Sequence, residues 1–304
     1  MNRSNPLFPY FCLMMAMILW ASTFVVLKLA FRIYDPMVVI FGRMAVASLC
    51  SLFFPFVFKN IRVRTKDIKY IVFMVVCEPC LYFVFEAEAL VHTSAAQAGM
   101  ITSMMPLMVA IGAWLILKER LTIQACIGFS IAITGALWLS FASRASVNGP
   151  NPLLGNFLEF MAMVCASGYA LALKKLTRNY SPLFLTFIQA FTGAVFFFPL
   201  LFLPGIQLPV KLEPVPLYAI FYLGSAVTLG AYGLYNYGVS KIPASQATAF
   251  INLIPVFSLI MSALVLGERF SSVQYMASGV VFFGVILSQD FKGQKEQQFE
   301  QVIK

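Results

Sequence analysis

Apolar residues form long continuous runs along this chain, and short polar breaks separate the runs. A helix that crosses a bilayer needs about 20 mostly apolar residues. Ten runs reach that length, at roughly residues 8–30, 37–58, 68–89, 94–117, 121–142, 153–173, 182–203, 215–238, 244–266 and 271–289. Their apolar positions are continuous rather than alternating, which favours helices over the strands of a membrane barrel. The pattern therefore predicts an all-α polytopic membrane protein with ten transmembrane helices.

The composition fits a chain that lies in lipid. Of the 304 residues, 61% are hydrophobic and 11% are charged, and the mean hydropathy is +0.86. Soluble domains carry roughly 25% charged residues. So few charges exclude an ordinary cytosolic enzyme, a disordered chain and a DNA-binding protein. The net charge is +9. In a membrane protein such an excess of basic residues marks the loops on the cytoplasmic side, so we expect no nucleic-acid partner.

The basic residues predict the orientation of the chain. If the N-terminus is inside, 15 of the 21 Lys and Arg residues fall in inner segments and five in outer segments, and Arg43 lies within the second span. Cytoplasmic loops are enriched in Lys and Arg. We therefore expect both termini in the cytoplasm and the protein in the inner or plasma membrane.

The sequence offers little for metal or cofactor chemistry. The six cysteines lie within apolar runs, where they fit small buried residues, and His92 is the single histidine. Neither a G-x-x-x-x-G-K-[ST] phosphate loop nor a His-Glu-x-x-His zinc motif occurs. We therefore expect no metal, no cofactor and no ATP-driven pumping by this chain. A membrane-embedded enzyme that acts on a lipid or lipid-linked substrate remains an alternative, as does an ion channel.

A repeat divides the chain into two halves. With a shift of 149 residues, Ala95, Gln97, Pro106, Glu119, Arg120 and Gly135 coincide with Ala244, Gln246, Pro255, Glu268, Arg269 and Gly284. We expect a five-helix repeat over residues 1–147, a linker over 148–152, a second repeat over 153–290 and a cytoplasmic tail over 291–304. Five is an odd number of spans, so the second half enters the membrane in the opposite direction. Two inverted repeats are typical of secondary transporters.

Several short motifs match a known family. They are Leu19-Trp20-Ala21-Ser22-Thr23-Phe24-Val25, Phe41-Gly42-Arg43-Met44-Ala45, the segment 89–98 that ends in Ala95-Ala96-Gln97-Ala98, Lys118-Glu119-Arg120 and Gly267-Glu268-Arg269. With the repeat, they resemble the EamA-type ten-helix branch of the drug/metabolite transporter superfamily over about residues 8–290. The resemblance implies a central cavity and transport of small metabolites, often outward. Glu86 and Glu88 depart from the neutral or aromatic residues that the family usually carries there.

Ionisable residues inside a bilayer are costly and usually face a cavity or a partner. Here they are Lys28, Arg43, Glu78, Glu86, Glu88 and Glu159. On the third span, Glu78, Tyr82 and Glu86 share one helical face. On the eighth span, similar spacing relates Thr228, Tyr232, Tyr235 and Asn236. Because the two spans are repeat mates, both faces are expected to line one substrate cavity.

Two interpretations of these charges stay open. In the first, Glu78 or Glu86 carries a proton or balances the charge of the substrate, since burial in a low dielectric favours the neutral form of a carboxyl group. In the second, Lys28 and Arg43 only neutralise Glu86 and Glu88 as an intramembrane charge network. Coupling of transport to protons is therefore left undecided.

Other polar and aromatic residues complete the predicted site. Gln97 and Gln246 precede Pro106 and Pro255 at equivalent positions, where they either bond across a helix interface or contact substrate. Trp20 and Thr23 lie in the middle of the first span, and Trp20 coincides with Tyr169 under the same shift. An aromatic pair of this kind either clamps a ring-bearing substrate or packs in the core.

Together these observations predict a secondary transporter that moves a small organic metabolite, such as an amino acid or a related compound, by alternating access. Export is favoured over import by the resemblance alone. The expected partners are the solute, the lipid bilayer and, if coupling exists, protons, and the protein is either a monomer or a homodimer. A small-residue stripe on the fifth span, Gly128, Ala132 and Ala136, predicts close helix packing.

Overall fold

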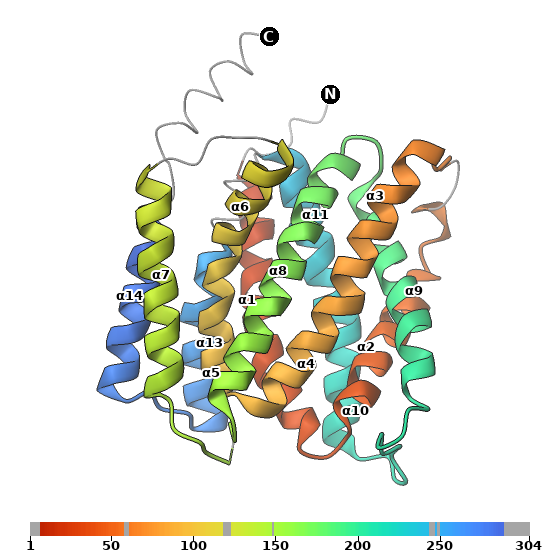
Figure 1. Ribbon diagram of the computed structural model, residues 1–304. Helices are drawn as coiled ribbons and strands as arrows, with labels where there is room; N and C mark the ends of the chain where they lie inside the picture. Colours follow the sequence, from red (N-terminus) through yellow and green to blue (C-terminus); the bar gives the residue numbers. More distant parts are fainter. Residues whose placement is uncertain are drawn as a thin grey trace.

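The computed structural model describes residues 7–57, 61–117, 123–147, 149–242, 247 and 250–288. Helices make up nearly all of this part of the chain, and it contains no strand. The helices stand side by side as one bundle (Figure 1). Seven helical segments are long and apolar enough to cross a membrane, and three shorter apolar helices bring the described total to ten.

The ten segments follow the predicted order. They are α1 (Phe8–Phe31), α2 (Pro36–Ser51), α3 to α4 (Thr65–His92), α5 (Ala95–Ile101) with α6 (Met105–Leu117), α7 (Ile123–Ala142), α8 (Pro152–Leu176), α9 (Pro182–Leu200), α10 to α11 (Pro214–Lys241), η5 to η6 (Phe250–Leu266) and α14 (Ser272–Ser288). One short 3₁₀ turn, η1 (Pro55–Val57), follows α2. The predicted all-α polytopic fold is confirmed.

Several helices begin with a polar cap followed by proline. The side chains of Asp35, Asn151 and Ser181 accept hydrogen bonds from backbone N–H groups in the first turns of α2, α8 and α9. Proline follows each cap, where its fixed φ suits a helix and its missing N–H costs nothing. The polar breaks in the sequence therefore define where these helices start.

The two halves of the chain repeat each other in the structure. α3 starts at Thr65 and α10 at Pro214, and α7 starts at Ile123 and α14 at Ser272, so both pairs are 149 residues apart. α1 starts at the upper end of the bundle in Figure 1, whereas α8 starts at the lower end. The second repeat therefore runs through the bundle in the opposite direction.

Proline breaks the same spans in both repeats. Pro106 and Pro255 are each the second residue of a helix, and a short 3₁₀ segment precedes each helix, η3 (Thr102–Met104) and η5 (Phe250–Leu253). A proline has no N–H to donate, and its ring clashes with the carbonyl four residues earlier. The preceding turn therefore tightens to 3₁₀ geometry in both halves.

The spans α3 to α4 and α10 to α11 are also interrupted at equivalent places. A kinked segment, η2 (Val76–Leu81), in which Glu78 is not helical, joins α3 (Thr65–Val75) to α4 (Tyr82–His92). A π-helical segment, η4 (Leu223–Ala231), joins α10 (Pro214–Tyr222) to α11 (Tyr232–Lys241). π-Bulges occur often at functional sites. Both interruptions lie in the middle of their spans, where a transmembrane cavity would be expected.

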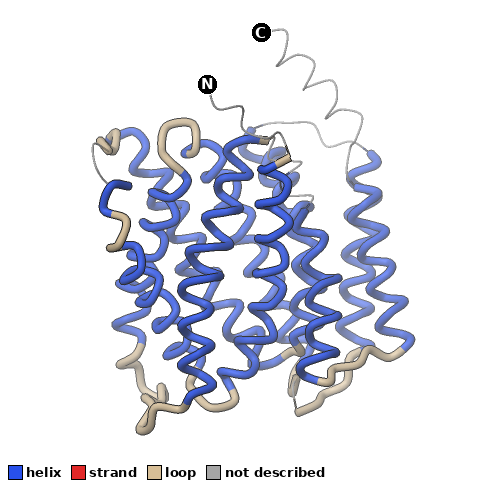
Figure 2. The backbone as a smooth tube through the Cα atoms, turned by 180° about the vertical axis from the view of Figure 1, so that it is seen from behind, coloured by secondary structure: helices blue, strands red, loops and turns tan. Residues whose placement is uncertain are grey.

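The small-residue stripe on α7 packs against α14. A Cβ atom added at Gly128 would come within 2.6 Å of the Gly284 carbonyl oxygen, and one added at Gly284 within 2.4 Å of the Ala132 nitrogen. Only small residues allow two helix backbones to approach so closely. Figures 1 and 2 show this pair at one edge of the bundle. The stripe therefore holds two spans of the same chain together.

At the lower end of the bundle, a carboxylate ties the second half to the first. Glu268 accepts hydrogen bonds from the backbone N–H groups of Ala95 and Ala96, at 3.2 and 3.0 Å. These two groups belong to the first turn of α5 and have no partner inside the helix. Glu268 thus caps α5 from the segment that follows η6 (Ser262–Leu266).

Candidate functional site

A cavity lies between helices of the bundle. Its walls come from both halves of the chain, including α1, α2, α4, α8 and α11. Eight of the residues that the sequence singled out line it: Trp20, Thr23, Arg43, Glu78, Tyr82, Glu86, Tyr169 and Tyr232. The remaining walls are mostly apolar, with Phe24, Phe83, Met105, Met163, Ile251 and Ile254 among them. The cavity is therefore a mainly apolar chamber with a few charged groups.

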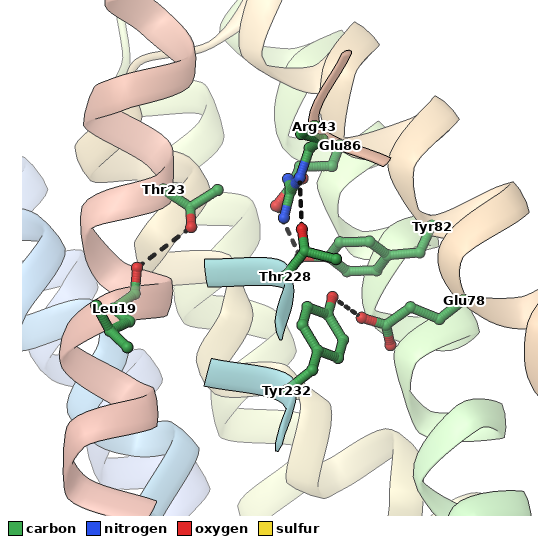
Figure 3. Close-up of polar contacts among 8 residues, drawn as sticks. All are labelled: Leu19, Thr23, Arg43, Glu78, Tyr82, Glu86, Thr228 and Tyr232. Atoms are coloured by element: carbon green, nitrogen blue, oxygen red, sulfur yellow. Dashed lines mark hydrogen bonds and ion pairs between the residues drawn. The ribbon is translucent and has the colours of Figure 1, made fainter. Parts of the chain in front are cut away.

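Glu78 lies where the third span breaks. Its φ of −149° and ψ of 117° are not helical, and its carboxylate is buried. The backbone carbonyl of Glu78, freed by the break, accepts a hydrogen bond of 3.2 Å from the Gln189 side chain. The hydroxyl of Tyr232 donates to the Glu78 carboxylate (Figure 3). The break thus places the Glu78 carboxylate at the cavity. Gln189 of α9 bonds its carbonyl oxygen, and Tyr232 of α11 bonds its carboxylate.

Arg43 and Glu86 form a loose buried ion pair. The guanidinium Nη1 of Arg43 is 3.8 Å from Oε2 of Glu86, and these two atoms have no hydrogen-bond partner in the described part of the chain. Nε of Arg43 donates to the Thr228 hydroxyl at 3.2 Å, and its guanidinium carbon lies 4.3 Å from the ring centre of Phe83. The two charged atoms therefore face each other across a gap longer than a hydrogen bond, on residues that line the cavity.

Tyr82 fixes the other oxygen of Glu86. Its hydroxyl donates to Oε1 of Glu86 at 2.9 Å, one helical turn away on the same face of α4 (Figure 3). Tyr82 and Glu86 share one face of α4, and Glu78 lines the same cavity from the break before it. Thr23 faces the same cavity from α1, and its hydroxyl donates to the Leu19 carbonyl.

Aromatic rings form the opposite wall. The ring of Trp20 packs against Tyr232 at 5.1 Å and against Tyr235 at 4.8 Å, and Tyr169 packs against Tyr232 at 6.2 Å. Nε1 of Trp20 is buried without a hydrogen-bond partner among the described residues. Trp20 and Tyr169, equivalent in the repeat, thus both contact the ring of Tyr232.

Asn236 lies behind this wall. It accepts a hydrogen bond of 2.6 Å from the Tyr169 hydroxyl and donates one of 2.8 Å to Thr186. Neither Asn236 nor Tyr235 is among the residues that line the cavity. Their contacts place them as supports that hold Tyr169 and Trp20 in position.

Gln97 lies in a separate polar cluster. Its side-chain oxygen accepts hydrogen bonds from Thr93 and Asn156, and Asn156 also donates to Ser140 at 3.0 Å. Gln97 is not among the cavity residues, so its position matches the interhelical role that was left open above. Its repeat mate, Gln246, lies outside the described residues.

The three residues of the predicted charge network do not meet. Arg43 pairs with Glu86, whereas Glu88 is exposed on α4. Glu88 follows Glu86 by two residues, which turns it to another face of the helix. Lys28 is buried near the lower end of α1, within electrostatic reach of Glu268. Neutralisation of Glu86 therefore comes from Arg43 rather than from Lys28.

Thr228, which shares the spacing of Tyr232 on the eighth span, accepts a hydrogen bond from Arg43. Sequence reasoning gave no role to two other polar residues near the site. Gln189 bonds the Glu78 carbonyl, and it carries no pattern that distinguishes it from other polar residues in apolar helices. Glu159 was recognised as an ionisable residue within a span but received no role. It is fully buried on α8, within electrostatic range of Glu86.

Within the described residues, no group of three or more His, Cys, Asp or Glu side chains is arranged to hold a metal ion.

Two inverted repeats of membrane-spanning helices around a cavity of this kind define a transporter fold. A sequence model of the EamA-like transporter family matches residues 7–141 and again residues 153–289. The chain therefore belongs to the EamA-like transporter family, and it is a multi-pass membrane protein.

Similar proteins carry transporter names. An uncharacterized transporter of Archaeoglobus fulgidus is 27% identical over 88% of this chain and 94% of its own length. A probable terminal-alkyne amino-acid exporter of Streptantibioticus cattleyicolor is 24% identical over 90% of this chain and 91% of its own. The uncharacterized transporter YetK of Bacillus subtilis is 26% identical over 65% of this chain, and the match spans 60% of YetK. A solved crystal structure has the same fold, with a TM-score of 0.62, 17% identity and coverage of 92% and 95% of the two chains.

Proposed function

We propose that this protein is a secondary transporter that moves a small amphipathic organic solute, with an amino acid or a close relative as the leading candidate. The observation that carries the proposal is the set of unsatisfied groups at the cavity wall. Among the described residues, Nε1 of Trp20 and Nη1 of Arg43 have no hydrogen-bond acceptor and Oε2 of Glu86 has no donor; Nη1 and Oε2 only face each other at 3.8 Å, in a buried site where such groups are costly. A solute that bonds to them would remove that cost.

The chemistry of these groups suggests how a solute binds. A guanidinium matches a carboxylate, and a carboxylate matches an ammonium group. Arg43 and Glu86 therefore complement a molecule that carries both charges close together, while Trp20 and Tyr232 offer a surface for its apolar part. The name of the Streptantibioticus relative, a probable amino-acid exporter, supports this class of solute and the outward direction.

The proposed mechanism is alternating access in the inner or plasma membrane. The cavity lies at the interface of two inverted repeats, and each repeat contains a proline break and a mid-span break at equivalent positions. Such breaks allow the two halves to exchange conformations around a fixed site. The basic inner segments support cytoplasmic termini.

The proposal is tested in two steps with purified protein. First, a metabolite library is screened by thermal shift, since a ligand selective for the folded state raises the apparent stability. Second, the best ligand is assayed for counterflow in proteoliposomes, where a carrier exchanges labelled for unlabelled solute. Saturable counterflow is the expected result. Flux without counterflow would indicate a channel, and consumption of a lipid substrate would indicate an enzyme.

A further inference from the structure

Glu159 is a buried carboxylate that the proposed binding site does not use. It is fully buried on α8, and neither carboxyl oxygen has a hydrogen-bond partner among the described residues. It does not line the cavity. A carboxylate left ionised and unpaired in such surroundings is very costly. Glu159 therefore needs either a proton or a charged partner.

The packing of α8 against α4 places Glu159 beside Glu86. The two helices run in opposite directions, and they pack tightly at Gly155, where an added Cβ atom would lie 2.6 Å from the Thr93 nitrogen and 2.9 Å from the Ala89 oxygen. Glu159 is one turn further along α8, and Glu86 is about one turn back along α4. The two carboxyl groups interact electrostatically, and Tyr82 is affected by both.

Few other charged groups reach this pair. Arg43, on α2, is paired with Glu86 at 3.8 Å, and Tyr82 donates to the same carboxylate. Glu78, in η2, is held by Tyr232 from α11. The described parts of α5, α6 and α7, which also pack near α8, contain no charged residue. The guanidinium of Arg43 is therefore shown paired with Glu86, and no cation is shown paired with Glu159 among the described residues.

We propose that Glu86 and Glu159 form a carboxyl pair that holds one proton between them, and that this pair, rather than Glu78 alone, couples proton movement to transport. Two carboxylates that share a buried site do not both ionise readily, so they retain a proton. A second proton neutralises Glu86 as well and releases Arg43 toward the cavity. The proton enters from water on one side of the membrane and returns to water on the other. The coupling role rests on the proposed transport function, whereas the pairing does not.

The pairing is tested without any solute. Protonated carboxyl groups of the purified protein in lipid are followed by infrared spectroscopy during a pH titration, and E78Q identifies the contribution of Glu78. The wild-type pair should release its protons in two separate steps, because coupled groups titrate as a pair. E159Q and E86Q should each leave a single step at a changed midpoint. E88Q, which changes an exposed carboxylate on α4, should leave both steps in place.

Specific results would overturn the pairing. If E159Q and E86Q each remove one step and leave the other at its wild-type midpoint, the two groups are independent. An unchanged titration in E159Q would show that Glu159 does not exchange protons at all. Gel filtration of each variant checks folding. If either E159Q or E86Q aggregates, the titration of the other variant decides whether the two groups are coupled.

The coupling role is tested in proteoliposomes with a mixture of radiolabelled L-amino acids as the probe. Wild-type protein should show counterflow and accumulation driven by a pH gradient, whereas E159Q should keep counterflow and lose most of the accumulation. Accumulation at the wild-type level in E159Q would overturn the coupling role. Absence of wild-type counterflow with this probe would count against the proposed function, while the infrared result would still decide the pairing.

Discussion

At the scale of single residues, the site depends on charged groups whose neighbours come from distant parts of the chain. Glu78 is held by Tyr232 and its carbonyl by Gln189, which are 154 and 111 residues away in sequence. Glu86 is held by Tyr82, one turn away, and by Arg43 from α2. Helical spacing predicted that Glu78, Tyr82 and Glu86 line one cavity, and it grouped Thr228 with Tyr232 on the eighth span. It could not identify Gln189, because partners across an interface depend on how helices pack.

Replacement of Glu78 by glutamine tests whether this carboxylate takes part in transport. We expect E78Q to reduce counterflow to background while the protein remains folded in the membrane, because the amide keeps the shape of the side chain but removes its negative charge. Counterflow of the best ligand, normalised to the amount of reconstituted protein, measures the effect. Y232F is the companion variant, since it removes the hydroxyl that donates to Glu78 and leaves the charge. Wild-type flux in E78Q would contradict the role.

Arg43 offers a test of carboxylate recognition. We expect R43K to weaken solute binding by about tenfold, which corresponds to about 1.4 kcal/mol, because lysine keeps the charge but loses the planar fork and the contact with Phe83. Thermal-shift titration of the ligand from the screen measures the change. If R43K binds as tightly as the wild type, a point charge is sufficient and the guanidinium has no specific role.

At the scale of helices, proline and glycine account for most of the irregular geometry. The prolines at 106 and 255 predicted two equivalent breaks, and the structure has a 3₁₀ segment before each. The π-helical segment η4 carries no proline, so no local signal predicted it. Its position is equivalent to that of η2 in the first repeat, and this equivalence appears only when the two repeats are compared. Local chemistry thus predicts where a helix must break, but not every place where it does.

The contact between α7 and α14 gives a prediction about stability. We expect G284A to destabilise the protein by about 1–3 kcal/mol, the usual cost of overpacking, because the new methyl group meets the backbone of α7 at 2.4 Å. G279A is a matched control on the same helix, where an added Cβ atom meets nothing within 4 Å. Thermal unfolding in detergent should show a lower midpoint for G284A only. Equal midpoints would mean that α14 shifts to accommodate the methyl group.

At the scale of the whole molecule, the order of hydrophobic runs and the 149-residue repeat were sufficient to predict ten spans in two halves. The exterior of the bundle is rich in exposed apolar side chains, including Phe141, Phe198, Phe221, Phe283 and Leu264, as expected for a surface in contact with lipid. The cavity between the halves follows from the repeat. Its detailed lining does not, since Gln97 and Asn236 bond to neighbouring helices.

The orientation of the molecule is tested by cysteine labelling. Arg62, in the segment before α3, and Arg144, in the segment after α7, are exposed. The start of α3 and the end of α7 lie at opposite ends of the bundle (Figure 1). On a background without native cysteines, we expect R62C to be protected from an impermeant thiol reagent added to intact cells, and R144C to react with it. The reverse labelling pattern would place the termini outside. Three spans separate the two positions. Labelling of both from the same side would contradict that odd number, and with it the odd number of spans in the first repeat from which the inversion follows.

The cap on α5 has an energetic consequence for the proposed cycle. Any conformation that admits water between α5 and the segment after η6 must separate Glu268 from the amides of Ala95 and Ala96. Each hydrogen bond to a charged group is worth about 1.5–3 kcal/mol. The cap therefore stabilises the conformation in which Glu268 contacts the first turn of α5. A solute that drives the exchange of conformations has to bind the opposite form more tightly by a comparable amount.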